Sequence, residues 1–221
     1  MDIGPILLSL RLALCTSVIL LVVGTPLAAF LAYGRFPGKA VLSSLLTLPI
    51  AIPPTVIGFY MLLFLSPYSP VGKFLAETIG LKLIFSFQGL VFASVIYSLP
   101  FFLGSVRTAM ERVDSTLLEA SHTLGKGSFA TFMHVSLPLS LPGMFAGFAL
   151  SFAHTLGEFG VVLMVGGNLP GETRTMSIEL YEKVEQSDFA SANAYALLLI
   201  GVSVASILFV HALERRAKAV L

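Results

Sequence analysis

The chain has 221 residues, of which 56% are hydrophobic and only 11% are charged, and its mean hydropathy is +0.92. A soluble domain of this size needs more polar surface, so the composition excludes a soluble globular protein and predicts an integral membrane protein. The formal net charge is +1, and the basic residues stand at the ends of apolar runs, which excludes nucleic-acid binding. The single cysteine, Cys15, excludes a disulfide framework and a cysteine metal site.

Five apolar windows are each long enough to cross a bilayer as a helix, which takes about 20 residues. They cover residues 12–33, 41–65, 88–108, 139–165 and 189–213. The first window is too long for a cleavable signal and has only Arg11 as a basic residue before it, so we expect a true span. Together the windows predict one all-α integral membrane domain over residues 1–221, with about five transmembrane helices.

An odd number of spans puts the two ends of the chain on opposite sides of the membrane. A cytoplasmic C-terminus places more basic residues inside than outside, in agreement with the positive-inside bias. The eight inside would be Arg35, Lys39, Arg107, Arg112, Lys126, Arg215, Arg216 and Lys218, and the five outside Arg11, Lys73, Lys82, Arg174 and Lys183. We therefore expect the N-terminus outside and the C-terminus inside.

A hydrophilic segment separates the third window from the fourth. Asp114 or Ser115 can cap a helix over about residues 115–125, and Gly125 is a natural left-handed stop for it. This helix has an apolar side and a charged side, but no neighbour of its own to pack against, which is typical of a docking surface for another protein. An ordinary cytoplasmic connector is the alternative on this pattern alone.

The hydrophilic segment resembles the signature loop of permeases of ATP-binding-cassette (ABC) importers, written Glu-Ala-Ala-x3-Gly-x9-Ile-x-Leu-Pro. Ser121 replaces the third residue of the signature, and Val135 replaces its isoleucine. The residues that hold the signature positions are Glu119, Ala120, Gly125, Val135, Leu137 and Pro138. The resemblance implies a type I importer permease fold whose cytoplasmic coupling helix docks in a cleft of an ATPase.

The same resemblance implies the partners and the location. The chain has no Gly-x4-Gly-Lys-Ser/Thr phosphate loop, so ATP and Mg²⁺ belong to a cytoplasmic ABC ATPase dimer, and this chain is a transport subunit without catalytic residues or a cofactor. A second copy of the permease completes the path around a two-fold axis, and an extracytoplasmic oxyanion-binding protein delivers the cargo. The location implied is the bacterial or archaeal cytoplasmic (inner) membrane.

Further segments resemble molybdate-transporter permeases over nearly the whole chain. They include Phe36-Pro37-Gly38-Lys39, Thr155-Leu156-Gly157-Glu158-Phe159-Gly160 and Gly167-Asn168-Leu169-Pro170-Gly171-Glu172-Thr173-Arg174-Thr175. Sulfate and tungstate permeases share much of this pattern, and residues 181–186 are similar to the sulfate branch. The resemblance favours an ATP-driven molybdate importer, with sulfate or tungstate as the alternative cargo.

Prolines interrupt the second window. Pro53 and Pro54 leave backbone groups without helical partners in mid-membrane, and Thr55 beside them carries a hydroxyl donor. Broken helices whose ends face an anion path are one interpretation of this pattern. Simple kinking to fit neighbouring helices is the other.

The fourth window carries a polar stripe. Gly147, Ser151, His154 and Glu158 follow one another at steps of four, three and four, so they share one helix face. An acid inside a membrane is functional by default, but an ionised Glu158 would repel an oxyanion. We therefore expect Glu158 to have a structural or gating role, with His154 or an arginine as its partner.

Arginine and histidine are the other residue types that could bind an anion or a metal ion. Arg174 has the charge to guide an anion at the outer mouth, with a solvated loop cation as the alternative. The four histidines are dispersed and lack ligand spacing, so we predict no metal site.

Two other classes of function compete with the importer. An ion-coupled carrier would use membrane acids for coupling and often shows inverted repeats, but Glu158 is the only serious acid for that task and no repeat is visible. A membrane scaffold without transport would leave the prolines and the signature unexplained.

Overall fold

The regular elements of the chain are helices. The computed structural model describes residues 2–220, including the side chains of residues 2–212 and Arg215; Met1 and Leu221, the ends of the predicted domain, lie outside the described residues, and so do the side chains of Arg216 and Lys218. The elements are α1 (Gly4–Ile19), the π turn η1 (Leu20–Gly24), α2 (Thr25–Tyr33), α3 (Lys39–Ala51), α4 (Pro54–Leu65), α5 (Pro70–Thr78), α6 (Phe87–Glu111), α7 (Ser115–Thr123), α8 (Ser128–Thr131), the π turn η2 (Phe132–Ser136), α9 (Leu137–Gly157), α10 (Gly160–Gly166), α11 (Met176–Glu185) and α12 (Phe189–Val220). Residues 2–220 contain no strand, and the predicted all-α fold class is confirmed.

In the part of the chain that the structure describes, four helical stretches are long and apolar enough to cross a membrane. They are Gly4–Tyr33, Phe87–Glu111, Ser128–Gly157 and Phe189–Ala212. The first stretch runs through η1 without a break, and the third runs through η2. Helices α3 and α4 make a fifth span if the pair is counted as one, which agrees with the expected number of about five.

The span expected over residues 41–65 is an elbow. Helix α3 ends at Ala51, α4 begins at Pro54, and the two are bent by 111°. Neither Pro53 nor Pro54 has an N–H group, so the helical hydrogen bonding cannot continue across this point. The prolines therefore do more than kink one helix, because they turn the chain into a new direction.

The span expected over residues 139–165 differs from the structure at both ends. The helix starts earlier, at Ser128, and it ends at Gly157, after which α10 begins at Gly160. Between them Glu158 adopts extended backbone, with ψ of 133°. The acid that we expected inside a continuous span therefore lies at a break between two helices.

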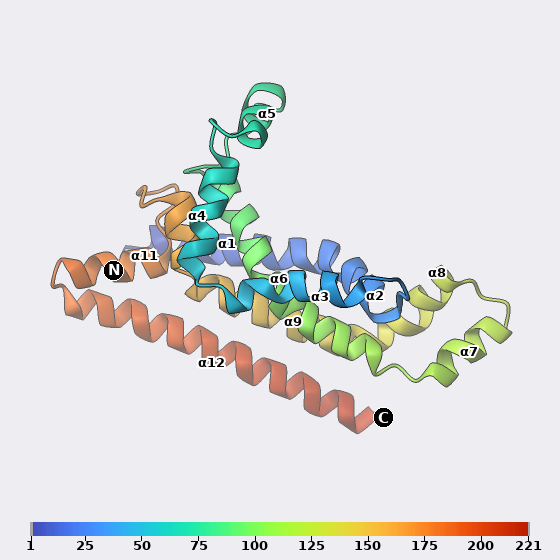
Figure 1. Cartoon of the computed structure of the whole chain (residues 1–221). Helices are drawn as coiled ribbons and strands as arrows, with labels where there is room; N and C mark the ends of the chain where they lie inside the picture. Colours follow the sequence, from blue (N-terminus) through green and yellow to red (C-terminus); the bar gives the residue numbers. More distant parts are fainter. Residues whose placement is uncertain (1, 221) are drawn as a thin grey trace.

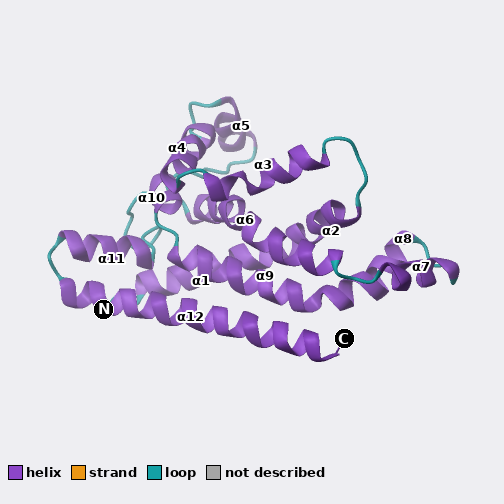
Figure 2. Cartoon of the chain, turned by 60° about the horizontal axis from the view of Figure 1, so that its bottom comes forward, coloured by secondary structure: helices purple, strands orange, loops and turns teal. Residues whose placement is uncertain are grey.

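The two ends of the bundle carry different elements. Helix α11 and the N-terminus lie together at one end, and α7, α8 and the C-terminus lie at the other (Figure 1). Figure 2, turned by 60°, shows the same separation. The termini thus lie at opposite ends of the bundle, as an odd number of spans requires.

Small residues let the long helices approach one another closely around Phe102. A Cβ atom on Gly143 of α9 would overlap the Cβ atom of Ala109 on α6, and one on Gly147 would lie 3.1 Å from the carbonyl oxygen of Phe102. A Cβ atom on Gly24 of η1 would lie 2.7 Å from the Phe102 ring, which is 0% exposed. Because lipid weakens the hydrophobic drive between helices, such close van der Waals contact holds them together.

We predict that Gly143→Val destabilises the protein by about 1–3 kcal/mol, because the added side chain forces α9 away from α6. The matched control is Gly201→Ala on α12, where a Cβ atom would have no neighbour within 4 Å. It should leave stability unchanged or raise it slightly. Thermal unfolding of the detergent-purified chain measures both, and an unchanged melting temperature for Gly143→Val would contradict the packing account.

Candidate functional site

Helix α7 has a capping residue at its start and a terminating residue at its end. The carboxylate of Asp114 accepts a hydrogen bond of 2.9 Å from the Thr116 N–H, which also lowers the pKa of Asp114. At the other end Gly125 has a φ of +79°, its N–H donates to the His122 carbonyl, and the Lys126 N–H donates to the Ser121 carbonyl. These bonds form a Schellman motif, which needs a left-handed residue at the position of Gly125. The helix is therefore set by its own sequence.

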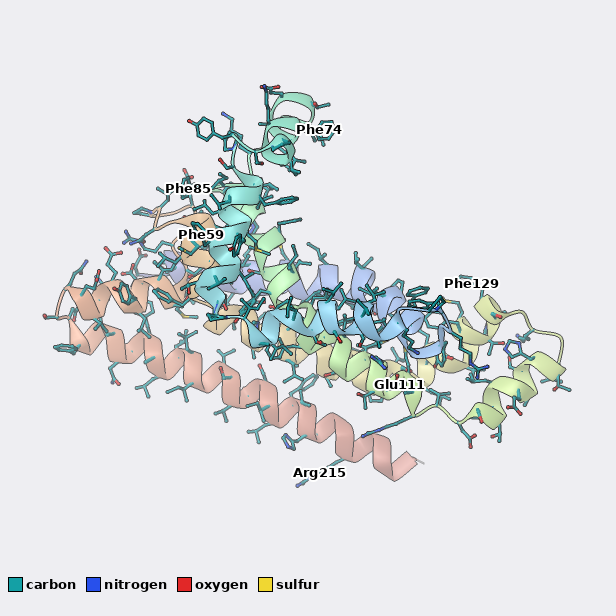
Figure 3. All side chains as sticks on the ribbon, in the orientation of Figure 1. Phe59, Phe74, Phe85, Glu111, Phe129 and Arg215 are labelled. Carbon is teal, nitrogen blue, oxygen red and sulfur yellow. The ribbon has the colours of Figure 1, made fainter. Side chains whose placement is uncertain are left out.

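The surface formed by α7, the linker Leu124–Gly127 and α8, called the α7–α8 surface below, is open. Glu119 and Ala120 are exposed, and so are two large apolar side chains, Leu124 (81% exposed) and Phe129 (79% exposed). Phe129 lies at the end of the molecule that carries α7 and α8 (Figure 3). Exposed apolar side chains beside charged ones are typical of a surface that a partner covers.

The second half of the signature lies where the polar segment enters the membrane helix. Val135 is part of the π turn η2, and Leu137 and Pro138 begin α9. The Leu137 N–H donates to the carbonyl of Phe132, five residues earlier, and Pro138 has no N–H to donate. All three side chains are half-buried or exposed, so the two halves of the signature belong to α7 and to the start of a membrane span.

The elbow brings the starts of α4 and α10 together. Pro53 and Thr55 are exposed, and Pro54 is half-buried. A Cβ atom on Gly160 would lie 2.8 Å from the Cβ atom of Pro54 and 3.2 Å from the Thr55 nitrogen. Beside the elbow, a groove of about 730 Å³ between α3, α4 and α6 has an apolar lining, including Leu48, Ile52, Tyr60 and Ile96. Tyr60 carries the one polar side chain of that lining, so the elbow itself is the better candidate for an anion path.

Glu158 and His154 have separate partners in the structure. The buried Glu158 carboxylate accepts a hydrogen bond of 2.7 Å from the Val161 N–H, and its carbonyl accepts one from the Ser177 hydroxyl. His154 Nδ1 shares a hydrogen bond of 2.9 Å with Ser98 on α6. The expected pair between Glu158 and His154 is not among the hydrogen bonds and ion pairs of the described side chains. Glu158 instead caps α10 through the Val161 N–H.

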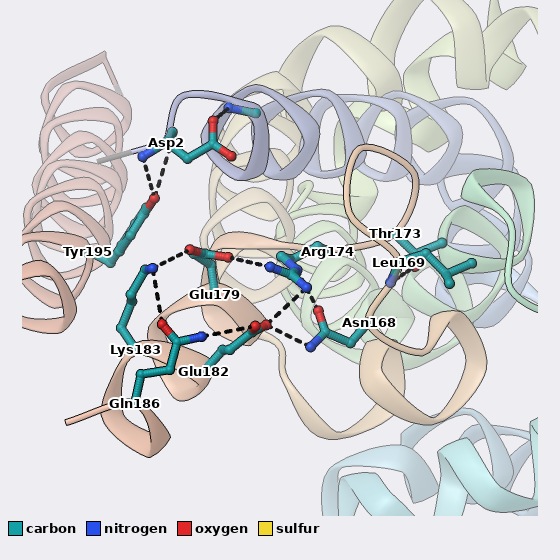
Figure 4. Close-up of polar contacts among 11 residues, drawn as sticks. Asp2, Asn168, Leu169, Thr173, Arg174, Glu179, Glu182, Lys183, Gln186 and Tyr195 are labelled. Atoms are coloured by element: carbon teal, nitrogen blue, oxygen red, sulfur yellow. Dashed lines mark hydrogen bonds and ion pairs between the residues drawn. The ribbon is translucent and has the colours of Figure 1, made fainter. Parts of the chain in front are cut away.

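Arg174 lies in an ion network at the α11 end (Figure 4). Its guanidinium donates to Asn168 at 2.6 Å and pairs with Glu179 at 3.3 Å and Glu182 at 3.1 Å. Lys183 pairs with Glu179 at 3.5 Å. Two cations face two carboxylates, so Arg174 is paired within the chain and is not a solvated loop cation. Its bonds instead join the loop before α11 to α11 itself.

A family model described as "Binding-protein-dependent transport system inner membrane component" matches residues 24–219. The chain belongs to this family. It is a membrane transport subunit, and the matched range includes α7, both breaks and all the candidate residues above.

Several related proteins align with this chain over most of its length. It is 46% identical over 193 residues to the molybdenum transport system permease protein ModB of Azotobacter vinelandii, covering 87% of this chain and 85% of that one. The corresponding protein of Escherichia coli (strain K12) is 37% identical over 202 residues, covering 91% and 88%. The sulfate transport system permease protein CysT of Salmonella typhimurium is 32% identical over 195 residues, covering 88% and 70%.

The fold has counterparts among solved structures. The chain superposes with a TM-score of 0.69 on a bacterial alginate ABC transporter in complex with an alginate pentasaccharide-bound periplasmic protein, covering 98% of this chain and 79% of that one. The sequence identity is 16%, so this likeness concerns the fold alone. It confirms the predicted importer permease fold.

The sequence analysis did not predict several side-chain contacts of the candidate site. Ser98, the partner of His154, lies on another helix that only the fold brings near. Val161, the partner of Glu158, is only three residues away, but the break between α9 and α10 at which they meet was not expected. The exposed Phe129 did leave a signal, because it is a lone aromatic residue in a polar stretch, Gly127-Ser128-Phe129.

We predict that Glu158→Gln retains most of the transport activity, because the amide oxygen can still accept the Val161 N–H. Glu158→Ala leaves that buried N–H unpaired and should cost about 1–3 kcal/mol of stability. Uptake assays and thermal unfolding of both variants test this. Loss of uptake in Glu158→Gln at normal stability would contradict the capping role and favour an acid that carries a coupling ion.

Proposed function

We propose that the chain is the membrane-spanning permease subunit of an ATP-driven molybdate importer. The observation that carries the proposal is the 46% identity to a molybdenum transport permease over 87% of this chain. Sulfate is the second candidate cargo, supported by 32% identity to a sulfate permease of which this chain covers 70%. Tungstate, an oxyanion of the same shape and charge as molybdate, shares the first candidate's support.

The charge of the cargo demands an energised route. A dianion that enters a cell with a negative interior climbs about 4–5 kcal/mol at 100 mV, taking about 2.3 kcal/mol per charge. A passive pore cannot concentrate such an ion. Under this proposal the energy comes from an ABC ATPase dimer that binds ATP and Mg²⁺, and the permease itself binds neither.

The α7–α8 surface is the proposed docking site for the ATPase. Its support is the open arrangement of Glu119, Ala120 and Phe129 at one end of the bundle, with no other part of the described chain covering them. This end also carries Arg107 and Arg215, which the positive-inside bias favours on the cytoplasmic side. The proposed orientation in the bacterial or archaeal inner membrane therefore has the C-terminus inside and the N-terminus outside.

The elbow between α3 and α4 is the proposed wall of the path. Helix ends within a membrane leave backbone N–H and C=O groups unpaired, and such groups are tolerated only against protein or water. Pro53 and Thr55 are exposed in the single chain, so a second copy facing them would enclose a hydrated path between two elbows. His154 and Glu158 then support the path from behind, through Ser98 and α10. An extracytoplasmic oxyanion-binding protein would deliver the anion at the α11 end.

We predict that Gly125→Val abolishes uptake and co-purification with the ATPase, because a β-branched residue cannot adopt the positive φ that ends α7. Gly125→Asn is the matched control, since asparagine tolerates this backbone, and it should retain most activity. Glu119→Lys should abolish both as well, while thermal stability changes by less than about 0.5 kcal/mol because the side chain is exposed. Normal uptake in Gly125→Val and Glu119→Lys would refute the docking site.

The cargo is tested with the reconstituted complex of permease, ATPase and binding protein. ATP hydrolysis is measured with the binding protein loaded by molybdate, tungstate or sulfate in turn. The proposal expects stimulation by molybdate and tungstate and little by sulfate. If only the sulfate-loaded binding protein stimulated ATP hydrolysis, the cargo would be sulfate and not molybdate.

A further inference from the structure

Ser121 makes a contact that the signature residue at its position cannot make. The third signature position carries alanine, whereas here the Ser121 hydroxyl lies 2.9 Å from the hydroxyl of Thr131. Both residues are buried, Ser121 at 7% and Thr131 at 4% exposure, although most of the residues around them are exposed. A hydrogen bond shielded from water in this way is stronger than one on the open surface.

This bond connects α7 to a membrane span. Thr131 is the last residue of α8, and α8 belongs to the continuous helical stretch Ser128–Gly157 that includes α9. Among the described side chains, it is the only hydrogen bond or ion pair that joins α7 to that stretch. The stretch packs against α6 at Gly143 and Gly147, so its position is coupled to the rest of the bundle.

The covalent connection between the same two elements is less stiff. Residues 124–126 are held to α7 by the hydrogen bonds of its C-terminal motif and by a hydrogen bond of 3.0 Å between His122 Nδ1 and the Lys126 carbonyl. The joint that remains is Gly127, which is exposed and around which a Cβ atom would have no neighbour within 4 Å. Glycine has more backbone freedom than any other residue, so this joint can take up a displacement of α7. A second connection between α7 and the span reduces the part of the displacement that the linker absorbs.

We propose that the Ser121–Thr131 hydrogen bond is a coupling tie, which makes α7 and the start of the stretch Ser128–Gly157 one rigid unit. A movement that the ATPase imposes on α7 is then passed to the membrane span and is not absorbed by the linker. This inference rests on the proposed function, and it makes Ser121 and Thr131 positioning residues for coupling. Neither needs to contact the ATPase or the anion.

Removing the tie should uncouple hydrolysis from transport. Ser121→Ala and Thr131→Val each delete one hydroxyl with little change of volume. In the reconstituted complex both should keep ATPase co-purification and ATP hydrolysis, while the molybdate transported per ATP hydrolysed falls about two- to tenfold, the factor that one neutral hydrogen bond supports. The double variant should be no worse than either single variant, because both remove the same bond.

The matched control is Ser206→Ala on α12. It deletes a hydroxyl whose hydrogen bond goes only to the Val202 carbonyl of its own helix. The ratio of molybdate transported to ATP hydrolysed should stay at the wild-type value. An exchange variant, which combines Ser121→Thr with Thr131→Ser, keeps a hydroxyl at both positions and should restore much of the ratio.

A distance measurement tests the tie without transport. Cys15 is the only cysteine, so spin labels can be placed at Thr116→Cys on α7 and Ser128→Cys on α8 in a Cys15→Ser background. The distribution of distances between the labels should be narrow, and it should broaden when Ser121→Ala is added. The Ser206→Ala variant should leave it unchanged.

The outcomes separate the tie from the proposed function. An unchanged transport ratio and an unchanged distance distribution in Ser121→Ala would overturn the tie. Loss of ATPase co-purification in Ser121→Ala and Thr131→Val would also overturn it, since the residues would then act in docking. If the wild-type chain binds no ATPase, the proposed function fails and the coupling role with it, while the distances still show whether the two helices are held together.

Discussion

The close approach of α6 and α9 around Phe102 is the contact on which the rest of the structure depends. In lipid, apolar side chains gain little by leaving one helix surface for another, so helices stay together only where their backbones can come near. Gly24, Gly143 and Gly147 allow this approach from η1 and α9. The result is a bundle of long helices that behaves as one body, with the elbow, the Glu158 break and the α7–α8 surface at its margins.

These margins differ in how their polar groups are satisfied. Glu158 accepts a hydrogen bond from the Val161 N–H, and Arg174 is paired with Glu179 and Glu182, so both side chains have partners within the chain. The elbow at Pro53 and the α7–α8 surface remain open in the single chain. The regions whose polar side chains have partners within the chain therefore stabilise the fold. The two open regions are the ones that the proposed function assigns to the second permease copy and the ATPase.

One helical stretch joins the two open regions. Ser128–Gly157 starts at the Ser121–Thr131 contact and ends beside Glu158, and the next helix begins at Gly160 against Pro54 of the elbow. A rigid helix moves as one body, so in the proposed mechanism a displacement of α7 reaches the elbow through this stretch. The π turn η2 lies within this stretch, at the point where the second half of the signature enters the membrane.

The sequence by itself determined the all-α membrane class, the approximate spans, the proline interruption and both ends of α7, because hydropathy and capping act between residues close in the chain. Its signature residues also pointed to the family. The tertiary structure alone decided that His154 bonds Ser98, that Arg174 is paired, and that Ser121 meets Thr131. A polar side chain in a low-dielectric interior takes the partner that the folded chain brings within about 3 Å, and residue spacing cannot specify that partner when it lies on another helix or beyond a turn.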